Sequence, residues 1–269
     1  MTASNPTPLI VRARPTGLRT FVGDTLLLTS RNLRLALRTP QLLVLTSIMP
    51  AMFVLLFRYV FGGSIHVPGY ASYVDYLIPG IIVQTSLFGG SSSAVGVAED
   101  TAKGVTDRLR ALPTHRTAIL AARTFADLIR LAYTVALLIA LGLLVGFRFG
   151  GTPAQVAAGL GITLLFGYAC SWLFTLLGLL VRDVESATMA GFLLTFPLVF
   201  ASSIFTAPAT FPHWLESFAK VQPVTRVTDA LRELSSGAGG AHAIPSALAW
   251  SFGISLVSAL LATWRFRRL

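Results

Sequence analysis

Few residues in this sequence have the types and spacing that catalysis requires. A serine nucleophile needs a histidine close enough to take its proton, and the four histidines all lie in expected loops: His66, His115, His213 and His242. A metal centre needs clustered His, Cys, Asp or Glu side chains, and the sequence contains no such cluster. We therefore predict that the chain is not an enzyme and binds no metal or cofactor of its own.

The lysines give no sign of a phosphate-binding loop. Such a loop has a lysine that follows a glycine and precedes serine or threonine, and neither Lys103 nor Lys220 has these neighbours. An ion-driven carrier would place ionisable residues within its membrane spans, and the apolar segments of this chain hold almost none. If the chain takes part in transport, we expect another polypeptide to supply the energy.

The composition indicates a membrane protein. Of the 269 residues, 54% are hydrophobic and 12% are charged, which is about half the charged share of soluble domains. The formal charge of +10 does not indicate nucleic-acid binding, because the basic residues lie between apolar segments rather than on a soluble surface. We predict an all-α polytopic protein of the cell (inner or plasma) membrane, with the lipid bilayer and no nucleic acid as a partner.

The apolar segments predict six transmembrane helices, because about 20 apolar residues cross a bilayer core. A disordered cytoplasmic tail over residues 1–17 and an interfacial helix over 18–38 precede them. We expect residues 18–269 to form a single membrane domain. The predicted spans cover approximately residues 41–61, 76–97, 128–147, 156–181, 187–205 and 247–264.

The basic residues predict the orientation. Most of the 21 lysines and arginines lie before the first span, between the second and third, or after the last. The positive-inside rule therefore places both termini and residues 99–116 in the cytoplasm. In the helix over residues 18–38, arginines share one face, which favours a helix at the membrane interface over a solvated helix. These arginines are Arg31, Arg34 and Arg38.

The segment over residues 206–240 is external by this rule, and its pattern predicts two short helices. Apolar residues recur at helical spacing in two groups: Phe211, Trp214, Leu215 and Phe218, and then Val224, Val227 and Leu231. Helices that re-enter the membrane from outside would satisfy the pattern, because irregular backbone at membrane depth must be buried in protein. Helices resting on the outer leaflet would satisfy it equally well.

The charged segment over residues 99–116 is the one cytoplasmic connection between spans that is long enough to contact a soluble partner. Read as one helix, it carries ion pairs at i, i+4 from Lys103 to both Glu99 and Asp107, and Pro113 ends it. Its apolar face has no soluble core of its own to cover, so we predict that a protein covers it. That face consists of Ala102, Val105, Leu109 and Leu112.

These residues, taken in order, resemble the membrane subunit of a type-2 ABC exporter, particularly the permeases of the daunorubicin/doxorubicin-resistance kind. The resemblance covers nearly the whole chain. It rests on Arg38-Thr39-Pro40, Pro79-Gly80, the loop Glu99…Gly104…Arg108-Leu109-Arg110-Ala111-Leu112-Pro113, Arg123, Asp127, Phe211-Pro212-His213-Trp214-Leu215, Gln222-Pro223-Val224-Thr225 and Leu231-Arg232.

The resemblance implies partners and roles that spacing alone does not give. It implies a separate ABC ATPase subunit that binds ATP and Mg²⁺, and a second permease copy or paralogue. It places the interfacial-helix arginines against the ATPase. It assigns the external segment to a gate over the path: Phe211, Pro212, Trp214, Leu215, Pro223 and Arg232. It assigns the contact with the ATPase to a coupling segment: Glu99, Lys103, Gly104, Val105, Asp107, Arg108, Leu109, Arg110, Leu112 and Pro113.

The favoured hypothesis is a permease subunit that moves an amphipathic drug-like or lipid-like compound outward, along a path between the second and fifth spans of paired subunits. Two alternatives remain open at this point: a permease for lipid-linked glycans, and a non-transporting membrane scaffold that recruits an ATPase. Residues expected to line the path are Gln84, Phe88, Phe196 and Phe200.

Overall fold

The regular elements of the protein are all helices in the part of the chain that a computed structural model describes, namely residues 18–38, 40–61, 70, 72–105, 108, 116–181, 183–237 and 242–268. This confirms the predicted all-α class. The helices are α1 (Leu18–Leu37), α2 (Pro40–Leu56), the π-helix η1 (Phe57–Phe61), α3 (Tyr73–Ala102), α5 (Arg116–Leu144), α6 (Pro153–Leu180), α7 (Val184–Phe200), the 3₁₀ turn η2 (Pro208–Thr210), α8 (His213–Val221), α9 (Pro223–Ser236) and α10 (Ile244–Arg268).

Four of the described helices, α3, α5, α6 and α10, are long and apolar enough to cross a membrane. The other two predicted spans correspond to shorter apolar helices. α2 has 17 residues, contains Pro50 and continues directly into the five-residue η1. α7 also has 17 residues and contains Pro197 near its end. Proline lacks the N–H that a helix interior uses, so each of these residues removes one backbone hydrogen bond from its helix.

Local capping sets the start of several helices. The Thr152 hydroxyl accepts a hydrogen bond from the Gln155 N–H, while the Gln155 side chain accepts from the Thr152 N–H, so α6 begins with a capping box. The carboxylate of Asp183 accepts from the Ser186 N–H at 2.7 Å and caps α7. Ser72 caps α3 in the same manner.

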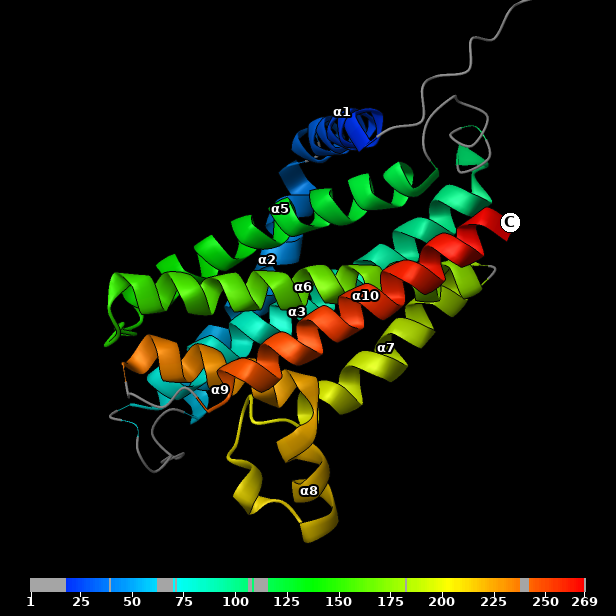
Figure 1. The fold of residues 1–269 in the computed structure, drawn as a ribbon. Coiled ribbons are helices and arrows are strands. Elements are labelled where there is room, and N and C mark those ends of the chain that lie inside the picture. Colours follow the sequence, from blue (N-terminus) through cyan, green and yellow to red (C-terminus); the bar gives the residue numbers. More distant parts are fainter. Residues whose placement is uncertain are drawn as a thin grey trace, which may run out of the picture.

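α3 lies at the centre of the bundle and packs along α6, α5, α7 and α9 (Figure 1). Small residues allow α3 and α6 to approach closely. A Cβ atom at Gly178 would lie 2.5 Å from the Ala94 carbonyl oxygen, and one at Gly90 would lie 2.8 Å from the Cys170 Cβ. Such contacts replace the hydrophobic driving force that lipid does not provide between spans.

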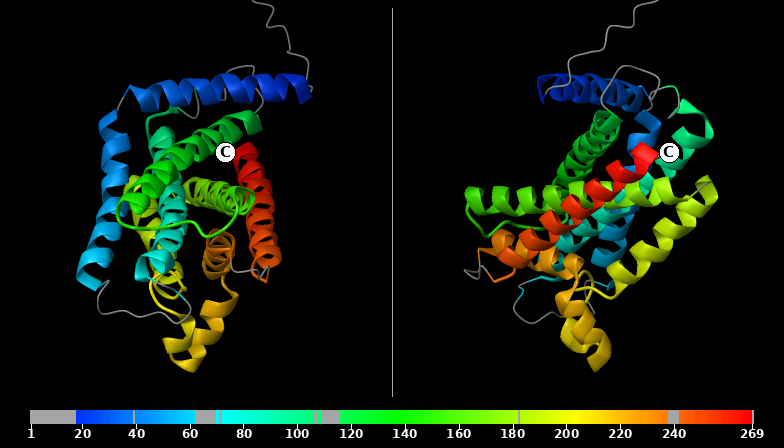
Figure 2. Two further views of the ribbon diagram at one scale, coloured as in Figure 1. Left: turned by 90° about the vertical axis from the view of Figure 1, so that its left-hand side faces the viewer. Right: turned by 45° about the vertical axis from the view of Figure 1, so that its right-hand side comes forward.

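The two ends of the bundle differ (Figure 2). α1 lies across one end, roughly perpendicular to the long helices, and the C-terminal end of α10 reaches the same end. α1 packs on α5, and the Thr29 hydroxyl donates to the Ala122 carbonyl at 3.3 Å. α8 projects at the opposite end. The structure thus places the N-terminal helix and the end of α10 on one side of the bundle.

Candidate functional site

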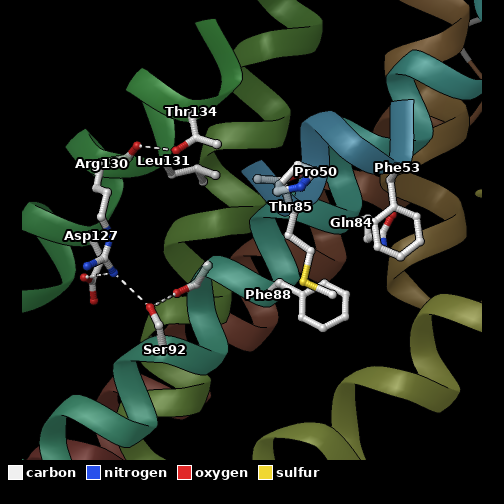
Figure 3. Close-up of a pocket in the computed structure, with 12 residues that line it drawn as sticks. Pro50, Phe53, Gln84, Thr85, Phe88, Ser92, Asp127, Arg130, Leu131 and Thr134 are labelled. Carbon is white, nitrogen blue, oxygen red and sulfur yellow. Dashed lines mark hydrogen bonds and ion pairs between the residues drawn. The ribbon is translucent and has the colours of Figure 1, made fainter. Parts of the chain in front are cut away.

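A cavity of about 250 Å³ lies between α2, α3 and α5 (Figure 3). Its walls are mostly apolar, and it has polar groups at separate positions. One end lies at Gln84 and Phe53, and the other at Asp127, Arg130 and Ser92. The lining residues are Met49, Pro50, Phe53, Gln84, Thr85, Phe88, Gly89, Ser92, Asp127, Arg130, Leu131 and Thr134.

At the charged end of the cavity, side chains of α3 and α5 form a network of hydrogen bonds around one ion pair. The Arg130 guanidinium donates to Asp127 Oδ1 at 2.7 Å and to the Ser92 hydroxyl at 2.9 Å. The Ser93 hydroxyl donates to Asp127 Oδ2 at 2.5 Å. Only 11% of the Asp127 side chain is exposed, so its hydrogen-bond partners are mainly these protein groups rather than bulk water.

A second ion pair lies nearer the end of the bundle that carries α1. Arg123 on α5 pairs with Asp100 on α3. The Arg123–Asp100 pair and the hydrogen bonds of Ser92 and Ser93 with the Asp127–Arg130 pair join α5 to α3. α5 is thus helical through residues that hydropathy alone assigns to a loop. The predicted third span began at about Leu128, whereas α5 begins at Arg116.

The other end of the cavity holds the amide of Gln84. This side chain is 4% exposed, and its Oε1 atom has no hydrogen-bond partner among the described residues. Phe53 lies beside it (Figure 3). A buried polar atom without a partner costs stability, and this one belongs to a side chain that lines the cavity.

The two predicted path residues on α7 lie outside the lining of this cavity but adjoin it. The Phe88 and Phe196 rings meet edge to face with centroids 6.3 Å apart. Phe196 stacks on Phe200 at 5.4 Å, and the Phe200 ring lies 5.7 Å from that of Phe205. Phe196 and Phe200 are about half exposed. Gln84 and Phe88 therefore face the cavity, while Phe196 and Phe200 extend an aromatic row along α7.

Sequence reasoning missed the contributions of α2 and α5 to the cavity. On α5, Asp127, Arg130 and Thr134 recur at i, i+3 and i+7, which places them on one helix face. That spacing is visible in the sequence once the helix is known to begin before Leu128. Met49 and Phe53 on α2 carry no comparable signal, because only packing brings them to α3.

The coupling segment is described only in part. The predicted pair between Lys103 and Glu99 is present at 3.1 Å. The prediction of one continuous helix is wrong at Gly104, because α3 ends at Ala102 and Gly104 has a left-handed φ of +66°. Helical backbone resumes at Val105 and includes Arg108, whose N–H donates to the Gly104 carbonyl at 3.3 Å. Residues Asp107, Leu109, Arg110, Leu112 and Pro113 lie outside the described part.

The predicted arginine face of α1 is exposed. Arg31, Arg34 and Arg38 are all exposed, whereas Asp24, Thr25 and Thr29 are buried. The segment is helical as expected, with α1 covering Leu18–Leu37.

At the end opposite α1, a buried arginine joins three segments. Arg232 on α9 is 3% exposed. Its Nε donates to the Tyr76 carbonyl at 3.0 Å, its Nη2 to the Ile204 carbonyl at 3.0 Å, and its Nη1 to the Ser203 hydroxyl at 3.2 Å and to Asp229 Oδ1 at 3.3 Å. The guanidinium carbon also lies 3.5 Å above the Tyr76 ring. We call these five residues the Arg232 cluster.

Tyr70 lies at the edge of the Arg232 cluster, with its ring 5.1 Å from that of Tyr76. Burial raises the pKa of the Tyr70 hydroxyl above its ordinary value, and the positive charge of Arg232 offsets part of that rise. The hydroxyl is therefore protonated at neutral pH, and it adds no negative charge near Arg232.

The two predicted short helices of the external segment are present, and their surroundings differ. In α9 the predicted apolar group is buried, with Val224 and Val227 fully enclosed and Leu231 2% exposed. α8 projects from the bundle, and Trp214 and Phe218 are exposed. Of the other predicted gate residues, Pro212 is exposed, while Phe211, Leu215 and Pro223 are half-buried.

Comparison with known proteins identifies the family. A family model described as ABC-2 type transporter matches residues 24–234. The chain is 32% identical over 228 residues to the daunorubicin resistance ABC transporter permease protein DrrB1 of Streptomyces coeruleorubidus, covering 85% of this chain and 80% of that protein. It is 25% identical over 251 residues to the probable doxorubicin resistance ABC transporter permease protein DrrC of Mycobacterium tuberculosis, covering 93% of this chain and 90% of that protein. The chain therefore belongs to the ABC-2 type transporter family and is the multi-pass membrane permease subunit of an ABC exporter, which works with a separate ATPase.

Proposed function

We propose that this permease moves an amphipathic, drug-like or lipid-like compound outward and that the cavity between α2, α3 and α5 belongs to its path. The observation that carries the proposal is the cavity itself, which combines aromatic walls with a few separate polar groups inside membrane helices. The names of the two relatives, which concern daunorubicin and doxorubicin resistance, favour a drug over a glycan. The aromatic row of Phe196 and Phe200 would extend the path along α7.

The proposed topology has six spans, with both termini in the cytoplasm. The two short apolar helices, α2 with η1 and α7, complete the four long ones. α1 and the basic end of α10, which carries Arg265, Arg267 and Arg268, lie at the same end of the bundle (Figure 2). The positive-inside rule assigns that end to the cytoplasm.

Energy enters, in this proposal, through the coupling segment from Glu99 to Pro113. A partner ATPase with ATP and Mg²⁺ would contact this segment and the arginine face of α1. The Gly104 break supports the role, because it separates the end of α3 from the helical turn at Val105 and Arg108. A short helix set off from the span in this way can enter a cleft on a partner. A second permease copy or paralogue would complete the transporter.

The external gate is assigned to α8, α9 and the turn before them. The buried α9 and the Arg232 cluster would close the outer end of the bundle. The projecting α8, with Trp214 exposed, would lie at the outer membrane surface.

Co-purification tests the coupling assignment. We expect Leu109→Asp to abolish recovery of the ATPase with the permease, because a carboxylate on the apolar face would be buried in the contact without a partner. Insertion of the permease into the membrane is measured in parallel and should persist. Trp214→Asp, at the opposite end of the bundle, serves as the control and should retain the ATPase. Recovery of the ATPase with Leu109→Asp would show that the coupling assignment is wrong.

Export itself is tested by ATP-dependent movement of daunorubicin in inverted membrane vesicles that contain the permease and its ATPase. Uptake into the vesicles is expected. If ATP is hydrolysed and no daunorubicin or other amphipathic compound moves, the chain is a scaffold rather than a transporter.

A further inference from the structure

The cavity contains one polar side chain whose hydrogen-bonding groups are unused. The other polar residues on its wall are already bonded within the protein. The Thr85 hydroxyl donates to the Ile81 carbonyl at 2.7 Å, and the Thr134 hydroxyl to the Arg130 carbonyl at 3.1 Å. Ser92, Asp127 and Arg130 bond to one another or to the backbone. Among the described residues of the lining, Gln84 is the one whose side-chain oxygen is buried without such a bond.

The absence of a partner for this amide costs stability that the fold does not recover. A buried polar group left unpaired costs about 1–3 kcal/mol, and an apolar side chain of the same size would avoid that cost. Gln84 is 4% exposed and faces the cavity beside Phe53. A ligand that occupies the cavity would supply the missing partner.

The walls around Gln84 set the shape of that ligand. Phe53, Phe88 and Met49 present two aromatic faces and a thioether, which favour an aromatic ring system. The volume of about 250 Å³ lies just below the range of pockets that enclose a whole drug-sized molecule. The cavity therefore accommodates one ring-bearing part of such a molecule.

The charge distribution sets the polarity of the group at Gln84. A charged group there would be desolvated beside a neutral amide, which is costly without a counter-charge. The charges at the far end are already neutralised, because Arg130 pairs with Asp127 at 2.7 Å. A neutral hydrogen-bonding group, such as a hydroxyl or carbonyl, fits an amide that can both donate and accept.

We propose that Gln84 is a specificity-determining residue that hydrogen-bonds a neutral polar substituent on an aromatic substrate held between α2, α3 and α5. The inference rests on the proposed export function and names the chemistry of its substrate. It differs from the predicted path between the second and fifth spans, because α2, α3 and α5 line the cavity and α7 does not.

The test measures daunorubicin binding to the permease–ATPase complex in lipid nanodiscs, followed by the fluorescence of the drug. Gln84→Met keeps the length of the side chain and removes the amide. We expect its Kd for daunorubicin to rise roughly three- to tenfold, which is the loss of one or two neutral hydrogen bonds. We also expect its unfolding temperature without drug to stay level or rise, since an unpaired buried amide is removed.

A matched control is Thr175→Val. Thr175 on α6 is fully buried, and its hydroxyl also lacks a partner among the described residues, but it does not line the cavity. This variant should bind daunorubicin as the wild type does. If Gln84 had a merely structural role, Gln84→Met would instead lower the unfolding temperature and leave the affinity for daunorubicin unchanged.

The outcomes separate this inference from the proposed function. If Gln84→Met binds daunorubicin with the affinity of the wild type, whatever its unfolding temperature, the role of Gln84 is overturned and drug export still stands. Gln84-dependent binding by a wild-type complex that never moves the drug supports the site and overturns export. A wild-type complex that does not bind daunorubicin overturns the Gln84 site, whereas export is judged by the vesicle assay.

Discussion

Replacement of Arg232 by methionine tests how the end of the bundle opposite α1 is held together. The change removes all four hydrogen bonds of the guanidinium and its contact with the Tyr76 ring. Methionine fills a similar volume, so the loss is mainly that of the polar contacts. The carbonyl oxygens of Tyr76 and Ile204 would lose a charged donor in a site that excludes water.

The magnitude follows from the surroundings of each partner. Removal of one member of a buried ionic network costs about 3–5 kcal/mol. The Asp229 side chain is 37% exposed, so water can solvate its carboxylate after the change, and the lower end of this range applies. We expect a loss of about 3 kcal/mol, which corresponds to a fall in unfolding temperature of roughly 6–12 °C for a chain of this size.

The assay is thermal unfolding of the purified permease in detergent, followed by tryptophan fluorescence. Arg226→Met is the matched control, because Arg226 lies on the same helix and makes no side-chain hydrogen bond or ion pair with the described residues. Arg232→Lys keeps the charge with a single nitrogen and should lie between wild type and Arg232→Met. If Arg232→Met is no less stable than Arg226→Met, the cluster does not hold α9 against α3.

Two further predictions concern helix packing and capping. Gly178→Ala should lower the unfolding temperature, because its Cβ would meet the Ala94 carbonyl oxygen at 2.5 Å. The control is Gly161→Ala on the same helix, whose Cβ would meet nothing within 4 Å and which should be neutral or stabilising. Equal effects of the two changes would argue against close α3–α6 packing. Asp183→Ala should also lower the unfolding temperature at neutral pH by removing the cap of α7. The Ser186 N–H and hydroxyl hold the pKa of the Asp183 carboxyl below its usual value, so its contribution is complete above the unfolded pKa and is lost as the pH falls below about 4. The gap between wild type and variant should therefore narrow in acid, and a gap that is constant with pH would contradict the capping role.

The sequence predicted the helices because long apolar runs have few alternatives in a membrane. It misplaced the start of α5 for a specific reason. Hydropathy treats Arg123, Asp127 and Arg130 as the end of a loop, whereas in the structure each pairs with a residue on α3 or α5 and the helix continues through them. Asp127 and Arg130 form a local i, i+3 pair, whereas the partner of Arg123 is Asp100 on α3, which no local pattern shows.

The candidate site was predictable to the extent that it lies on one helix. Gln84 and Phe88 are one turn apart on α3 and both line the cavity, so helical spacing was sufficient to group them. Met49 and Phe53 reach the cavity through the packing of α2 on α3, which no local pattern encodes. The Gly104 break had a local signal, since an isolated glycine in a helical pattern marks a possible end.

α3 connects the three functional regions through one continuous element. Its 30 residues span about 45 Å at the rise of an α-helix. One end carries Glu99 beside the coupling segment, the middle carries Gln84 and Phe88 at the cavity, and the other end carries Tyr76 in the Arg232 cluster. A helix resists axial compression, so a displacement of the end that carries Glu99 would be passed on to the cavity wall. Pro79, which lies between the cavity and Tyr76, removes one backbone hydrogen bond and is the place where α3 can bend, so that the Arg232 cluster can stay closed while the cavity wall moves.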